Sequence, residues 1–344
     1  MNKLRVSWFF VLSLLGGAMV VSTDAGAQGA KGVFNRPQQV QRAAPVLTQN
    51  VANVMTDRQT GTSNAASNGA LDGVPVLNGF HLKFSNGDHE LRKVSVLVAS
   101  PSSATIALID KNADDPYRAE ATWINIKGGG TRGEVHAAGG GQFDVPLPTQ
   151  RPPNSRLVLT GFELRDQDDD HIRMVGVWLD ETRNVARVSF LNHISGWFSA
   201  AGTRLGAAGV PVPDRIGAIS SKVFPTAAAA DAYVSANDNY SYRAFAVRLQ
   251  YAFIPNTIVE GEDYFTGSSR APSSGKIFQP RAAIQGFEFF FDNKAHHLLE
   301  IGVMPRLPGS AVSARAPQGE YIAFQDKNRD DPIKWAVKLL TIKP

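Results

Sequence analysis

Two acidic heptapeptides are the residues in this sequence whose types and spacing most resemble a ligand site. D-K-N-A-D-D-P at 110–116 and D-K-N-R-D-D-P at 326–332 match at six of seven positions. Their side-chain oxygens fall at positions 1, 3 and 5, the spacing with which a calcium loop begins. Calcium is therefore a candidate ligand for two sets of residues: Asp110, Asn112 and Asp114, and Asp326, Asn328 and Asp330.

The same loops have a structural interpretation. Aspartate stands at position 6, where a calcium loop needs glycine, and Ala121 and Val337 stand at position 12, where it needs glutamate. Asx turns that end at a proline would give a strand connection of this composition without an ion. A similar spacing at Asp166, Asp168 and Asp170 falls on an expected turn, where an exposed chain is polar in any case.

Three histidines recur at one distance from a Gly-Phe pair, and imidazole is a common metal ligand. The glycine-to-histidine spacing is ten residues in each copy: Gly79 to His89, Gly161 to His171 and Gly286 to His296. A cross-strand aromatic pair is the simpler explanation, with Phe84 opposite His89 and Phe291 opposite His296. In the middle copy Asp166 takes the place of the phenylalanine, which predicts a carboxylate–imidazole pair with His171.

No catalytic residue can be assigned from motifs. The sequence has no nucleophile elbow, no phosphate-binding glycine loop and no H-E-x-x-H motif. It also has no cysteine, which excludes disulfides, thiolate metal sites and a cysteine nucleophile. An acidic cluster of Glu260, Glu262 and Asp263 lies beside Tyr264 and Phe265, and paired carboxylates of this kind can hydrolyse a glycoside. A solvated loop is the simpler explanation of the cluster.

The aromatic residues of one long segment suggest a binding surface. Residues 192–240 interrupt the middle copy, and they place Trp197 and Phe198 in a Ser/Gly-rich setting unsuited to a strand interior. Flat aromatic side chains on loops of a rigid scaffold can stack on sugars, although they can also pack over the rim of a sheet. The candidate ligand-binding residues are Trp197, Phe198, Tyr240 and Tyr242.

The elements that must position these residues are predicted to be strands. In the first copy they are expected at 80–84, 91–99, 104–109 and 117–126, and Asn86-Gly87 predicts a tight hairpin between the first two. A lone four-stranded sheet cannot bury its apolar face, so the copies must pack together. We therefore predict an all-β fold of tandem antiparallel sandwich-like units, from a repeat of roughly 50 residues present three times. A short helix is expected after Thr226.

The N-terminus resembles a secretory signal. Lys3 and Arg5 precede an uncharged run at 8–21, and Ala25-Gly26-Ala27 offers small residues to a signal peptidase. The run is shorter than the ~20 residues of a membrane-spanning helix. We predict a signal peptide at 1–27, with a signal anchor as the alternative, and a secreted or periplasmic protein.

The rest of the chain divides by composition. A flexible, disordered leader is expected at 28–70, which has few aromatic residues. The predicted β repeat units are unit 1 at 71–150, unit 2 at 151–280 with its insertion at 192–240, and unit 3 at 281–344.

The pattern as a whole favours a binding or structural protein. The chain holds 35 basic and 31 acidic residues, and loss of the signal would leave a net charge of +3, too little to indicate a nucleic-acid partner. We expect a glycan or surface-protein partner, met through the insertion of unit 2, with no membrane span and with calcium as the one candidate cofactor. The alternative is a secreted, glycosidase-like hydrolase that uses loop carboxylates.

Overall fold

The computed structural model describes ten segments of the chain. They are residues 47–48, 54–66, 72–192, 203–205, 211–213, 221–237, 244–269, 281–304, 321–327 and 331–344. All of them belong to one compact unit, Ala43–Pro344, while the predicted signal peptide at 1–27 lies outside the described residues. The described residues are nearly all antiparallel strand, with one α-helix. The all-β prediction is confirmed.

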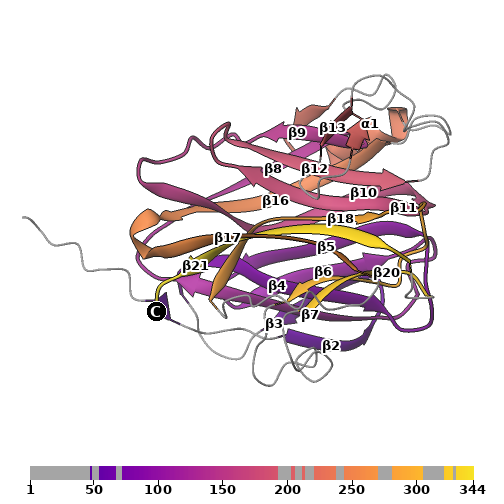
Figure 1. The fold of residues 1–344 in the computed structure, drawn as a ribbon, viewed down its shortest axis with the longest axis horizontal. Helices are drawn as coiled ribbons and strands as arrows, with labels where there is room; N and C mark the ends of the chain where they lie inside the picture. The colour runs from indigo at the N-terminus through magenta and orange to yellow at the C-terminus, as the bar shows by residue number, and fades with distance from the viewer. Residues whose placement is uncertain are drawn as a thin grey trace, which may run out of the picture. The chain divides into compact units, whose positions relative to one another are not determined.

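Three large sheets share one hydrophobic core (Figure 1). The first sheet contains β1 (Leu47–Thr48), β2 (Val54–Gln59), β4 (Val74–Phe84), β7 (Tyr117–Ile126), β19 (Glu300–Met304) and β20 (Tyr321–Gln325). The second contains β3 (Thr62–Ala66), β5 (Leu91–Ser100), β6 (Ser103–Ile109), β8 (Thr131–Gly140), β10 (Ser155–Asp170), β15 (Lys222–Phe224) and β16 (Ala244–Pro255). The third contains β9 (Gln142–Pro146), β11 (Ile172–Asp180), β12 (Val185–Asn192), β17 (Val259–Ser269), β18 (Ala282–Phe291) and β21 (Ile333–Ile342). The short strands β13 (Thr203–Leu205) and β14 (Pro211–Pro213) pair only with each other.

The three strands that carry the Gly-Phe pairs have equivalent places in the three sheets. Strand β4 pairs with β7 on one edge and with β19 on the other. Strand β10 likewise lies between β16 and β5, and β18 lies between β21 and β11. Each sheet is therefore centred on two strands from one predicted unit and two from another.

The predicted hairpin at Asn86-Gly87 is wrong. Strand β4 lies in the first sheet and β5 lies in the second, so this turn is a corner between sheets. The two strands separate because a hairpin of β4 and β5 alone would bury little apolar surface and leave two unpaired edges. Crossing to the next sheet gives both strands a partner on each side.

Three phenylalanines mark the point where the sheets meet. Phe80, Phe162 and Phe287 are fully buried, and their ring centroids are 4.9 to 5.0 Å apart in all three pairs. One comes from each sheet, so the three rings define an approximate three-fold axis. Tilted contacts at this distance suit the quadrupoles of aromatic rings.

A β-bulge precedes each of these phenylalanines. The strand register shifts at Asn78, Thr160 and Gln285, and all three polar residues are fully buried. Asn78 Nδ2 donates to the carbonyl of Ala282 at 2.6 Å, and Gln285 Nε2 donates to the carbonyl of Leu157 at 2.7 Å. These bonds join sheets to one another at the level of the phenylalanines.

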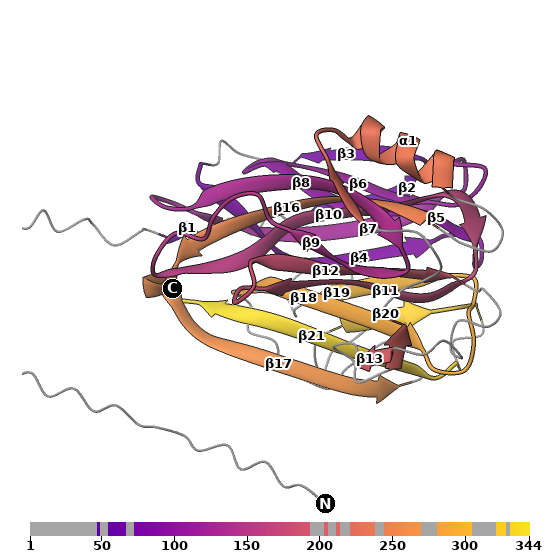
Figure 2. The same cartoon turned by 90° about the horizontal axis from the view of Figure 1, so that it is seen from above.

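The predicted helix is confirmed as α1 (Ala227–Asn237). Its cap is the predicted one, since the backbone N–H of Ala229 donates to Thr226 Oγ1 at 3.2 Å. Ala230 and Val234 pack on small residues of β8 and β16, on the outside of the second sheet (Figure 2). Among the described residues, no helix combines the length and apolar character needed to cross a membrane.

The outer face of the second sheet holds a buried ionic network. The side chain of Glu163 is only 6% exposed and lies between Lys93 Nζ, at 2.7 Å, and the guanidinium of Arg165. Arg165 also reaches Asp231 of α1 at 2.6 Å. Burial alone would raise the pKa of Glu163, but the charges of Arg165 and Lys93 outweigh it and hold this pKa below its usual value.

Replacement of Gly161, which follows the bulge of β10, should lower the stability of the fold for steric reasons alone. In Gly161→Ala the new methyl would lie 2.7 Å from the carbonyl oxygen of Val96 and 2.8 Å from Cα of Leu97, and backbone cannot move aside easily. We expect a loss of about 3 kcal/mol in the free energy of unfolding, measured by urea denaturation. The matched control is Gly261→Ala, which meets nothing within 4 Å and should leave stability within about 1 kcal/mol of wild type. Equal effects of the two substitutions would contradict the close approach of β5 and β10.

Glu163→Gln should reduce both stability and its dependence on acid. The glutamine removes the carboxylate from Lys93 and leaves Arg165 paired with the partly exposed Asp231, at a cost of about 2 kcal/mol at neutral pH. Because the pKa of Glu163 is lowered by folding, its contribution exists above the usual pKa of 4.5 and is lost as pH falls through the folded value. Denaturation from about pH 6 to about pH 3 should therefore show a shallower loss in the variant than in wild type. The exposed Glu260→Gln should change neither quantity, and an unchanged slope in Glu163→Gln would contradict the assignment.

Candidate functional site

The corners between sheets converge at one end of the approximate three-fold axis. His89 and Leu298 exchange backbone hydrogen bonds of 2.9 and 2.8 Å, and Ile172 and His296 exchange bonds of 2.8 and 3.0 Å. The third crossing is the pairing of Asp170 with Leu91. Successive copies of the corner are thus held to one another in the same way.

These crossings correct the sequence alignment of the histidines. His89 faces Leu298 and His296 faces Ile172, and in the middle copy the residue that makes the same crossing is Asp170. The corner of the middle copy is one residue shorter. The ten-residue spacing therefore aligned His171 with His89 and His296, to which it is not equivalent. Its structural counterparts are the next residues, Glu90 and His297.

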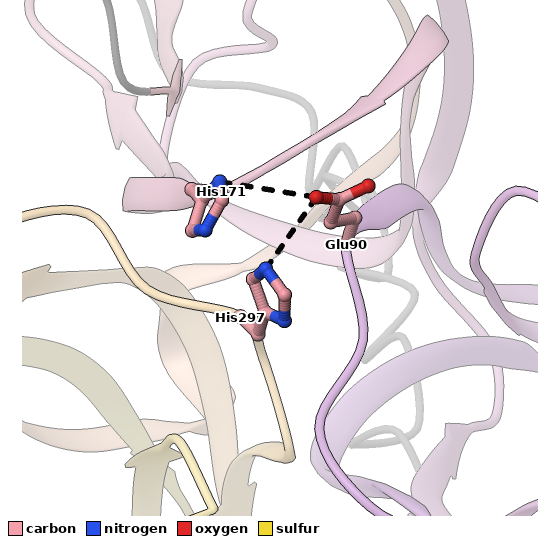
Figure 3. A group of neighbouring side chains, drawn as sticks. All are labelled: Glu90, His171 and His297. Atoms are coloured by element: carbon pink, nitrogen blue, oxygen red, sulfur yellow. Dashed lines mark ion pairs between the residues drawn. The ribbon is translucent and has the colours of Figure 1, made fainter.

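Glu90, His171 and His297 meet at this end of the axis (Figure 3). Glu90 Oε1 lies 3.4 Å from His297 Nε2 and 4.0 Å from His171 Nδ1. The two imidazole rings are in contact, with centroids 4.1 Å apart. The side chains are 37%, 44% and 37% exposed, so solvent reaches the group. Figure 3 shows that the three residues come from three different segments and point toward one another.

The group, named the axial triad below, has the donors of a metal site. Its ligand atoms all lie within 4.8 Å of one another and comprise two imidazole nitrogens and a carboxylate oxygen. Sequence reasoning singled out His171 but missed Glu90 and His297. Each of these follows a repeated histidine directly, and only the one-residue offset of the middle copy reveals that the three positions are equivalent.

The repeated histidines His89 and His296 contact the acidic heptapeptides. His89 Nδ1 lies 3.0 Å from Asp110 and 3.4 Å from Asp115, and its Nε2 lies 3.1 Å from Asn86. In the third copy His296 Nδ1 lies 3.3 Å from Asp326 and 3.2 Å from Asp331. Its Nε2 lies 2.8 Å from Asn293. Positions 1 and 6 of each heptapeptide therefore hold the histidine of their own corner.

The electrostatics of these corners fit a structural role. Burial and the neighbouring Asp115 raise the pKa of Asp110, while hydrogen bonds from Asp110 and Asn86 lower the pKa of Asp115. The pKa values of the two carboxyl groups of the first copy are therefore shifted in opposite directions. In the third copy burial lowers the pKa of His296, which favours the neutral ring.

Only part of each predicted calcium set is brought to these corners. Asp110 lies in the first corner, where its Oδ1 accepts a bond from the backbone N–H of Asn112 at 3.1 Å, the expected Asx turn. Asn112 and Asp114 are exposed. Asp326 lies in the other corner, while Asn328 and Asp330 lie outside the described residues. Calcium binding by the two heptapeptides stays one of two hypotheses, beside a purely structural role for these loops.

The predicted aromatic contacts of the histidines are present. The ring centroids of Phe84 and His89 are 4.4 Å apart, and those of Phe291 and His296 are 4.7 Å apart. In the middle copy His171 faces Glu90 and His297. Asp166 is buried, and its Oδ1 accepts a bond from the backbone N–H of Gln167 at 2.7 Å.

A second candidate region lies on the outer face of the third sheet. Directly paired residues form one row across five strands, and members of such a row point to the same face. In order they are Arg187, Trp178, Gly286, Lys338 and Tyr264. Trp178 is half-buried over Gly286, and Tyr264 is 55% exposed. The two rings make an edge-to-face contact at 5.7 Å, and we call them the aromatic pair.

Charged groups surround the aromatic pair. Burial and the charge of Glu288 raise the pKa of the Tyr264 hydroxyl. Glu262 lies 2.9 Å from Lys338 Nζ and also pairs with Arg156. Burial alone would raise the pKa of Glu262, but these two cations hold it below its usual value.

The remaining predicted site residues are the aromatic residues of the insertion and the acidic cluster. Trp197, Phe198, Tyr240 and Tyr242 lie outside the described residues. In the acidic cluster, Glu260 is exposed and the Asp263 carboxylate accepts a bond from Thr341 at 3.3 Å. Comparison with known proteins adds no relative: no protein-family model matches the chain, and no curated protein sequence matches it.

Calcium should leave the thermal stability of the chain unchanged. Asp110 is engaged with His89, and its predicted partners Asn112 and Asp114 are exposed to solvent. An ion bound to the folded state alone, at a hundredfold excess over Kd, would add roughly 2.7 kcal/mol to the free energy of unfolding. We expect equal melting midpoints in millimolar calcium and in chelator. A higher midpoint in calcium that Asp110→Asn and Asp326→Asn abolish would instead establish the heptapeptides as calcium sites.

Proposed function

We propose that the chain is a secreted or periplasmic all-β binding protein whose ligand is a glycan. The observation that carries this proposal is the aromatic pair on the outer face of the third sheet. Sugars present flat C–H faces and a rim of hydroxyl groups, so proteins bind them with aromatic rings beside hydrogen-bonding side chains. Trp178 and Tyr264 supply the rings, and Lys338 and Arg187 of the same row supply donors.

The position of the pair favours binding over packing. Tyr264 keeps more than half of its surface exposed, although the core of the protein buries nearly every other large apolar side chain among the described residues. Its strand, β17, is at the edge of the third sheet. Because β17 pairs with β21 along almost its full length, the backbone that carries Tyr264 is rigid. An aromatic side chain held out from a rigid sheet loses little further entropy when it meets a ligand.

The carboxylates nearby support binding better than hydrolysis. A glycosidase needs one carboxylic acid that is protonated at working pH, so the pKa of that acid must be raised. Glu262 has the opposite property, because Arg156 and Lys338 keep its pKa low. The insertion at 192–240, with Trp197 and Phe198, remains a second proposed contact surface for the same ligand or for a surface protein.

Tyr264→Ala should weaken glycan binding without unfolding the protein. An exposed aromatic anchor contributes about 1–3 kcal/mol to binding, which is a loss of roughly 5- to 150-fold in affinity. The measurement is a glycan array with the purified chain, followed by calorimetric titration of the best glycan. Tyr264→Phe is the matched control and should keep most of the affinity, because the ring is retained.

Two other results would change the proposal. Loss of binding in Trp197→Ala with full binding in Tyr264→Ala would move the site to the insertion. Failure of the wild-type chain to bind any glycan would contradict the ligand class. Melting curves accompany each variant, and we expect the midpoint of Tyr264→Ala to stay near that of wild type because the ring is largely exposed.

A further inference from the structure

We propose that Glu90, His171 and His297 bind a divalent transition-metal ion at the end of the three-fold axis. This inference is independent of the glycan surface, which lies on the outer face of the third sheet. It rests on the chemistry of the three donors, their distances and the way in which the backbone beside each donor is fixed.

The donors lie close to the spacing that a metal ion requires. Zinc binds imidazole nitrogen and carboxylate oxygen at about 2.0–2.2 Å, so neighbouring ligand atoms of a tetrahedral site are roughly 3.4 Å apart. The Glu90–His297 contact already has a length of 3.4 Å, and the Glu90–His171 contact is 4.0 Å. Small rotations of exposed side chains would close the remaining gap around an ion.

The donor set selects the class of metal. Calcium and magnesium prefer sites made of oxygen ligands, whereas imidazole suits zinc, copper, nickel, cobalt and iron. Two imidazoles and one carboxylate leave coordination positions open, and all three side chains are more than one-third exposed. The ion would therefore be exchangeable and could accept a further ligand from solution.

The backbone fixes the triad before any ion arrives. His89 and His296, which directly precede Glu90 and His297, are held by reciprocal backbone bonds to Leu298 and Ile172. Ile172 in turn directly follows His171. All three ligand positions are thus next to a residue in one of these backbone crossings. Preorganised ligands of this kind lower the entropic cost of binding an ion.

The other histidine clusters are poorer candidates. In the two corners His89 and His296 have partners on both ring nitrogens, namely aspartates at Nδ1 and an asparagine at Nε2. Binding an ion there would break hydrogen bonds that hold the corner. In the axial triad the three side chains present their ligand atoms to one another (Figure 3).

The test is titration of the chelator-treated full chain with Zn²⁺ by calorimetry and with Co²⁺ by visible absorption. We expect one ion per chain and no competition by millimolar Ca²⁺. His171→Ala, His297→Ala and Glu90→Gln should each weaken binding at least about tenfold, since even loss of an outer-shell partner costs that much. The Co²⁺ bands should weaken or shift in the same three variants.

The matched control is His136→Ala, which removes a histidine that pairs with Glu134 on the second sheet at 3.1 Å. It should bind as wild type does. Unchanged affinity in His171→Ala and His297→Ala, or equal loss in His136→Ala, would overturn the proposal. Loss only in Asp110→Asn or Asp326→Asn would also overturn it, by moving the ion to a corner. Metal-free melting curves establish that each variant is folded, and the near-isosteric Glu90→Gln decides the question if a histidine variant is not.

Discussion

The exchange of strands between sheets is the constraint on which the rest of the structure depends. No predicted unit completes a sheet alone, because its first strand pairs with the return strand of another unit. The three sheets that result meet where the rings of Phe80, Phe162 and Phe287 contact one another. Burial of three aromatic rings against one another requires all three sheets at once. The three sheets therefore form one core around the axis rather than a row of independent sandwiches.

The same exchange explains why polar residues gather at one end of the axis. Each first strand must leave its sheet and enter the next, and the corner that does so has backbone groups with no strand partner of their own. The repeated histidine and the heptapeptide aspartates hold this corner in two copies, and backbone crossings join it to the next copy. One residue per copy, Glu90, His171 or His297, then meets its two counterparts at this end. The axial triad is thus a consequence of the fold's symmetry, although the residue types at those positions are not.

The sequence was sufficient for the strands of the repeat, the capped helix and the phenylalanine–histidine contacts, because each depends on local pattern. The leader predicted at 28–70 was wrong in part, since β2 and β3 lie within it and pair with β7 and β6. It was not sufficient for two features that depend on pairing across the molecule. Asn86-Gly87 favours a tight turn whether the flanking strands pair with each other or part into different sheets. The position of His171 was misjudged because a one-residue deletion in a corner leaves the apolar pattern of the next strand intact. Both errors arise where the chain changes sheets, and there local propensity carries no information about the partner.

The corner histidines and the axial histidines differ in burial, and this difference indicates which of them the fold requires. A histidine that folding requires is buried and has its ring nitrogens engaged, as His296 is with Asp326, Asp331 and Asn293. The side chains of the axial residues are more than one-third exposed, and their removal would open no cavity in the core. Stability alone would be served as well at those positions by almost any small polar residue. Two imidazoles and a carboxylate in mutual contact are therefore better explained by a ligand than by the demands of the fold.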